Sequence, residues 1–119
     1  MAANVAKNPP QPNSAPQTAE EYFQRAWGYY VKGDQNKAEQ DFQQALSVDS
    51  QSVEAYYGLG LTLKMQGSLE PALQAFEKAI DLVKAGVMRE DRVRATMLRN
   101  LAEWHIFSLK SGMNKEEKS

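Results

Sequence analysis

The sequence predicts an all-α protein in which helical hairpins stack on one another. Apolar residues recur at intervals of three and four along most of the chain, as they do on the buried face of an amphipathic helix. Glycines and helix-capping residues divide the chain into segments of helical length, and one 34-residue segment recurs. With 42% hydrophobic and 24% charged residues, the 119 residues are expected to form one folded domain.

Residues 1–17 are expected to precede the folded domain as a disordered, proline-rich leader. They hold four prolines among Asn, Gln, Ser and Ala, and this composition buries too little apolar surface to offset the entropy of ordering. A rival interpretation, a proline-rich ligand for a partner's groove, lacks a clear spaced motif. The folded domain is therefore predicted to span residues 18–112.

The first helical hairpin is predicted at residues 19–52. Thr18 and Glu21 fit a capping box, in which the hydroxyl and the carboxylate satisfy free backbone amides at the helix start. Gly33 interrupts the first helix, and Asp34 can cap the second. The second helix carries apolar residues at helical spacing, namely Ala38, Phe42, Ala45 and Leu46.

The second hairpin is predicted at residues 53–86. Gly67 ends its first helix and Ser68 can cap the next, where Pro71 falls in the first turn and its missing amide costs little. Gly86 offers a C-terminal cap. The apolar faces of the two helices are formed by Tyr56, Leu59, Gly60 and Leu63, and by Ala72, Phe76, Ala79, Ile80 and Val83.

The two hairpins repeat one pattern of residues. Special positions recur with a separation of 34 residues, pairing Tyr22 with Tyr56, Ala26 with Gly60, Gly33 with Gly67, Ala38 with Ala72, Phe42 with Phe76, and Ala45 with Ala79. A period of about 34 with these residue types resembles the tetratricopeptide repeat. The resemblance implies hairpins stacked as a short right-handed solenoid, with two repeats followed by a C-terminal capping helix.

Each repeat departs from the family pattern at a few positions. Arg25 stands where the family usually has Leu, and Ser50 and Lys84 replace the usual proline after the second helix. The small residues of the pattern let antiparallel helices approach closely, while the phenylalanines fill the neighbouring groove. Because Arg25 replaces the usual Leu in the first repeat, the match to the family is more specific for the second repeat than for the first.

Residues 87–110 are predicted to form a fifth helix that caps the second repeat. The period breaks here, and residues 98–102 resemble the first helix of a partial third repeat, displaced by an insertion within residues 85–97. A cap is required because a repeat buries its apolar face only against a neighbour. Residues 113–119 are predicted to be a charged tail. The apolar face of the fifth helix consists of Val93, Met97, Leu98, Leu101, Ala102, Trp104 and Leu109.

The resemblance places the candidate binding site on the first helix of each hairpin. In this family those helices line a concave groove, and the second helices line the outer face. The groove residues are Glu20, Phe23, Trp27 and Tyr30 in repeat one, and Glu54, Tyr57, Leu61 and Lys64 in repeat two. Steps of three, four and three residues keep each set on one helix face.

The groove side of the first helix is aromatic, although another face with Tyr22, Ala26 and Tyr29 already supplies the hairpin packing. Exposed aromatic patches commonly mark binding surfaces. We therefore expect a protein-binding module, a scaffold or adaptor, whose groove receives an apolar or amphipathic peptide or helix of another protein.

Two other interpretations of the aromatic patch stay open. The chain's own fifth helix or leader can cover it, since helices that are apolar all round are often buried. Alternatively, the groove or the fifth helix forms the homo-oligomer interface of a self-associating structural module, because the stack is short. Recognition of a chaperone's terminal carboxylate is not implied, because Phe23, Trp27 and Gly58 replace the Lys, Arg and Asn of the family's clamp.

Composition argues against other function classes. The absence of cysteine excludes disulfides, thiolate nucleophiles and Cys-based zinc sites. Fourteen basic and fifteen acidic residues give a net charge of −1, so neither nucleic acid nor a membrane is an expected partner. The single histidine, His105, lacks companion groups for a catalytic or metal site, so no enzymatic activity, cofactor or metal is expected. Without a secretory signal or membrane span in the sequence, the expected location is cytoplasmic.

Overall fold

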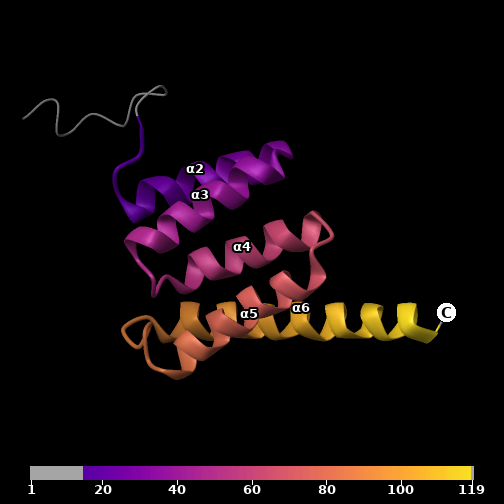
Figure 1. Cartoon of the computed structure of the whole chain (residues 1–119). Helices are drawn as coiled ribbons and strands as arrows, with labels where there is room; N and C mark the ends of the chain where they lie inside the picture. Colours follow the sequence, from indigo (N-terminus) through magenta and orange to yellow (C-terminus); the bar gives the residue numbers. More distant parts are fainter. Residues whose placement is uncertain (1–14, 119) are drawn as a thin grey trace, which may run out of the picture.

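The computed structural model describes residues 15–118, with side chains as far as Gly112. These residues form the helices α2 (Ala19–Lys32), α3 (Gln35–Val48), α4 (Val53–Met65), α5 (Leu69–Lys84) and α6 (Arg92–Lys118). Helix α2 pairs with α3 and α4 with α5 as antiparallel hairpins, while α3 packs on α4 and α5 on α6 (Figure 1). The predicted all-α helical-repeat solenoid is confirmed. The predicted leader, residues 1–17, lies outside the described residues as far as residue 14.

The first hairpin begins and turns at the residues that local sequence signals indicate. The Thr18 hydroxyl accepts from the Glu21 amide at 3.1 Å, and the Glu21 carboxylate accepts from the Thr18 amide at 3.1 Å, which completes the capping box. Gly33 ends α2 with φ 89°, a left-handed conformation that favours glycine. Asp34 caps α3 by accepting from the Lys37 amide. Each of these signals acts on backbone groups only a few residues away from it.

The second hairpin corrects one capping prediction. Ser68 stands at the N-cap of α5, but its side chain makes no capping hydrogen bond. The caps of α2, α3 and α4 each accept from the amide three residues further on. In α5 that residue is Pro71, which has no amide proton. Pro71 thus fits the first turn of α5 and leaves Ser68 without a donor.

Two phenylalanines at equivalent repeat positions fill the space between helices. Phe42 and Phe76 are fully buried. A Cβ added to Gly58 would lie 2.5 Å from the Phe42 ring, and one added to Gly60 would lie 2.7 Å from the Phe76 ring. The rings therefore occupy the space that larger side chains on α4 would need, and they join α3, α4 and α5 in one core.

The fifth helix differs in extent from the predicted residues 87–110. Helix α6 starts later, at Arg92, and continues to Lys118 through the segment predicted as a charged tail. Lys and Glu are abundant in residues 113–119 and are good helix formers, so charge alone does not end the helix. The C-terminal part of α6 extends past the ends of both hairpins (Figure 1).

A turn separates α5 from α6 and explains the late start of α6. Gly86, two residues after the end of α5 at Lys84, has φ 89°, and backbone hydrogen bonds join Arg89 to Gly86 and Asp91 to Met88. The Asp91 carboxylate then accepts from the Arg94 amide at 3.1 Å, as an N-cap residue does.

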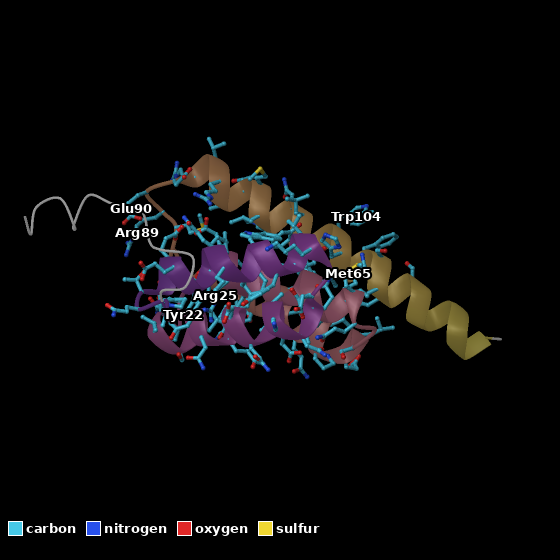
Figure 2. The ribbon with its side chains drawn as sticks, turned by 90° about the horizontal axis from the view of Figure 1, so that it is seen from above. Tyr22, Arg25, Met65, Arg89, Glu90 and Trp104 are labelled. Atoms are coloured by element: carbon cyan, nitrogen blue, oxygen red, sulfur yellow. The ribbon has the colours of Figure 1, made fainter. Side chains whose placement is uncertain are left out.

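The apolar residues of α6 divide between two faces, whereas the sequence analysis assigned them to one. The buried face consists of Ala95, Leu98, Ala102 and Leu109. The exposed residues are Val93, Met97, Leu101 and Trp104. The prediction of a single face was wrong because, at 3.6 residues per turn, the two sets point to different sides of the helix. Figure 2 shows Trp104 projecting from α6 away from the hairpins.

Candidate functional site

The predicted groove residues of repeat one form an aromatic cluster on α2. The rings of Phe23 and Trp27 meet edge to face with centroids 6.1 Å apart, and those of Trp27 and Tyr30 do so at 5.3 Å. Phe42 lies behind them, 5.9 Å from Phe23 and 5.7 Å from Trp27. We call Phe23, Trp27 and Tyr30 the α2 row; all three are half-buried. Each ring of the row therefore packs against a neighbouring ring.

The predicted groove residues of repeat two lie beside the α2 row. The Tyr57 ring packs on Phe76 at 5.7 Å, as the α2 row packs on Phe42. Burial, and then the charge of Tyr30, raise the pKa of Tyr57. Leu61 is half-buried against the core. We call Glu54, Tyr57, Leu61 and Lys64 the α4 row.

Helix α6 contacts the α4 row through His105. The Tyr57 hydroxyl lies 3.3 Å from Nε2 of His105, and the Lys64 ammonium lies 3.1 Å from Nδ1. An ammonium can only donate, so Nδ1 accepts and the ring is neutral, with its proton on Nε2 donated to the Tyr57 oxygen. Burial, and then Lys64, lower the pKa of His105. The imidazole also stacks on Phe76, with centroids 4.9 Å apart. His105 therefore joins α4, α5 and α6.

A third row on α6 adjoins the α4 row. Arg94 forms an ion pair with Glu54, and the Lys64 ammonium lies 5.4 Å from the centroid of the Trp104 ring. The residues of this α6 row are Arg94, Met97, Leu101 and Trp104, spaced by three, four and three as in the other rows. Arg94 is not among the site residues predicted from the sequence, although the same spacing could have identified it. Both ends of the α6 row contact the α4 row.

Coverage by α6 differs between the two predicted halves of the groove. Glu54, Tyr57 and Lys64 contact α6, whereas α2 and α6 do not pack together in the part of the chain that the structure describes. Glu20 is exposed and accepts a hydrogen bond from Gln24 of its own helix. Helix α6 therefore covers part of the α4 row, whereas it leaves the α2 row uncovered.

A hollow of about 350 Å³ lies at the N-terminal ends of α2 and α4. It is lined by Thr18, Ala19, Glu20, Phe23, Asp49, Ser52 and Glu54, so it borders the α2 row. A second hollow of about 410 Å³ lies at the junction of α5 and α6 and includes none of the predicted groove residues. The described residues hold no group of three or more side chains suited to a metal ion. None of the helices within residues 15–118 has the length and apolarity needed to cross a membrane.

Comparison with family models decides the nature of the hairpins. A model described as TPR repeat matches residues 29–67, and one described as Tetratricopeptide repeat matches residues 53–82. The chain belongs to the tetratricopeptide-repeat family. Its repeats, like those of the family, form a protein–protein interaction module.

A solved structure shares this fold. The crystal structure of MamA is similar with a TM-score of 0.55 and 24% identity over 86% of this chain, which spans 62% of the MamA chain. A chain of the CopN-Scc3 complex aligns with a TM-score of 0.49 and 14% identity, over 92% of this chain and 84% of that one. A search of curated proteins found no match. At such identity the MamA similarity concerns the fold alone.

Proposed function

We propose that this tetratricopeptide-repeat chain is an adaptor or scaffold whose concave face binds an apolar or amphipathic peptide or helix of another protein. The observation that carries the proposal is the α2 row. Phe23, Trp27 and Tyr30 are neighbouring aromatic side chains that remain partly exposed, and within the described residues α6 does not pack on their helix. Aromatic residues that are rigid and partly exposed are typical anchors of protein interfaces.

The geometry of the α2 row favours binding at a small entropic cost. Edge-to-face contacts hold the Trp27 ring between Phe23 and Tyr30, and Phe42 supports it from the core. Side chains that are already ordered lose little rotamer freedom when a ligand binds. A partner's apolar residues would gain contact with ring faces without displacing any part of the hairpins.

Each predicted groove residue has a distinct role in this proposal. The α2 row supplies an apolar surface for the partner, and Leu61 of α4 extends this surface. Glu20 provides a polar rim. Glu54, Tyr57 and Lys64 hold α6 in position. Their contribution is indirect, because α6 forms the wall of the groove that lies opposite α2. No step of this function requires catalysis or a cofactor, and a net charge of −1 does not favour nucleic acid.

The proposal is tested by selecting displayed peptides on the full chain and measuring their affinity for variants by calorimetry. Trp27→Ala should weaken binding at least tenfold, which corresponds to about 1.4 kcal/mol. Val31→Ala is the matched control, because Val31 lies on the same helix but is highly exposed outside the row. It should change affinity less than twofold. Circular dichroism on both variants checks that helix content is kept.

Two results would contradict the groove proposal. One is a selection that yields no binding peptide. The other is a set of peptides that bind Trp27→Ala and the parent chain equally well, because their site would then lie elsewhere on the molecule.

A further inference from the structure

The α2 row continues into the hollow at the N-terminal ends of α2 and α4. Phe23 belongs to both, because it is a member of the row and also lines the hollow of about 350 Å³. Within the described residues α6 does not pack on α2, so a partner that lies on the row can reach the hollow without displacing α6. The aromatic row and the hollow therefore form one continuous surface.

The hollow is acidic. Among the described residues that line it, three carry a carboxylate and none is basic. The acidic residues are Glu20, Asp49 and Glu54. Glu54 forms an ion pair with Arg94 of α6. Glu20 and Asp49 are exposed and accept hydrogen bonds from uncharged amide groups, at 3.0 and 3.1 Å. Neither has a cationic partner in the part of the chain that the structure describes.

The helix ends balance part of this negative charge. The N-termini of α2 and α4 each carry about half a positive charge, which carboxylates in the first turn commonly offset. Arg94 supplies one further positive charge through its ion pair with Glu54. The three carboxylates exceed these positive charges by about one. The hollow therefore complements one cationic group of a partner.

The arrangement favours an arginine side chain over a metal ion. The described residues hold no group of three or more side chains that could bind a metal ion, so the carboxylates do not converge on one point. A guanidinium presents five N–H donors in a planar fork and can reach carboxylates that stand apart. Its face also stacks on aromatic rings such as that of Phe23. Arg94 already pairs with one carboxylate of the hollow.

We infer that the segment bound by the proposed groove carries an arginine that enters this hollow, while its apolar residues pack on the α2 row. The inference rests on the proposed function and adds the chemistry of the partner, which is a basic amphipathic segment. Along α2, Glu20 and Trp27 are about 10 Å apart at 1.5 Å per residue. In a helical partner lying along α2, an apolar residue seven positions from the arginine matches this distance on the same helix face.

Two libraries of synthetic helical peptides test the inference on the full chain. Both have the same apolar composition, and they differ at one fixed position, which is arginine in one library and citrulline in the other. Citrulline keeps the shape of arginine and lacks its charge. Measured by calorimetry, captured peptides should bind about fivefold more tightly in the arginine form. The difference should shrink as the salt concentration rises.

Variants of the chain locate the arginine. Glu20→Gln combined with Asp49→Asn should bring the affinity ratio of the arginine and citrulline forms close to one, because both changes remove charge and keep size. Glu54 is left in place because it holds α6. The matched control is Glu77→Gln combined with Asp81→Asn, at exposed positions of α5, which changes the net charge equally and should leave the ratio unchanged. Circular dichroism checks that each variant keeps its helix content.

Three results would overturn the inference, and they differ in what they say of the groove. Peptides whose capture depends on Trp27 but that bind equally well in both forms contradict the arginine and leave the groove function standing. An arginine preference that survives Glu20→Gln with Asp49→Asn places the guanidinium elsewhere on the molecule. If neither library yields a peptide whose capture depends on Trp27, the groove proposal fails and the arginine site fails with it.

Discussion

Helices α2 and α4 occupy equivalent positions in the two repeats but have different neighbours. Helix α4 lies between α3 and α5 and also contacts α6, whereas α2 packs mainly on α3. Gly58 and Thr62 of α4 are accordingly buried, while Gln24 and Gly28, 34 positions earlier, are exposed. One repeated pattern thus gives an inner helix with two covered faces and an outer helix with one. The difference follows from position in the stack, as expected for a repeat protein.

The position of α2 at the end of the stack also accounts for Arg25, which departs from the family pattern. Arg25 and Asp41 of repeat one correspond to Leu59 and Ala75 of repeat two, both of which are buried. Arg25 binds Asp41 through two hydrogen bonds of 2.6 and 3.0 Å, with the Arg25 side chain 44% exposed and that of Asp41 6% exposed. The hydrogen bonding to Asp41 raises the pKa of Arg25. An outer helix can use this polar pair because the guanidinium keeps access to water.

The largest expected effect comes from filling the close approach on the inner helix. Gly58→Ala should lower the free energy of unfolding by about 3 kcal/mol, the upper end of the range for overpacking, because the Phe42 ring is buried and cannot move aside. Gly28→Ala is the matched control on the outer helix, where an added Cβ meets nothing within 4 Å. It should stabilise α2 by up to about 1 kcal/mol through helix propensity.

Urea denaturation of both glycine variants measures these free energies. Similar effects at Gly58 and Gly28 would show that α2 and α4 do not differ in packing as described.

A smaller effect is expected at the polar pair. Arg25→Leu should cost about 2 kcal/mol, because it leaves the buried Asp41 carboxylate without its partner. Asp41→Ala should cost less, about 1 kcal/mol, since the half-exposed Arg25 can turn to water. The double variant resembles repeat two and should recover most of the loss. A double-mutant cycle measured by thermal and urea unfolding gives the coupling between the residues; additive losses would contradict this account.

The smallest expected effect concerns pH and the contact of α6 with the inner helix. Burial and then Lys64 lower the pKa of His105, so the folded chain favours the neutral ring. As pH falls, the unfolded chain binds this proton first, and stability is lost. The contribution is full above the ordinary histidine pKa of 6.5 and declines below it.

Unfolding at pH 7.5 and at pH 5.5 tests the role of His105. The parent chain should lose more stability between the two conditions than His105→Gln, which carries no titrating group at this position. Comparing the two proteins removes the contribution of carboxylates that they share. Identical losses would mean that the folded chain does not favour the neutral ring of His105.

The candidate site shows which parts of this protein a sequence can predict. The spacing of the α2 and α4 rows places each set on one helix face, and in the structure Phe23 and Glu54 line one hollow between the two helices. Their binding role stays a prediction. The spacing did not reveal that Lys64 and Tyr57 meet His105, because those contacts join residues far apart in the chain.

By itself, the sequence determined the features that depend on neighbours within a few residues or on the repeat. Examples are the capping box at Thr18, the left-handed turn at Gly33, and the burial of Phe42 and Phe76 at equivalent positions of the two repeats. Tertiary structure decided which apolar residues of α6 are buried and which are exposed. It also decided that Arg25 reaches Asp41. Helical spacing defines the faces of a helix, but burial of a face depends on which other helices pack against it.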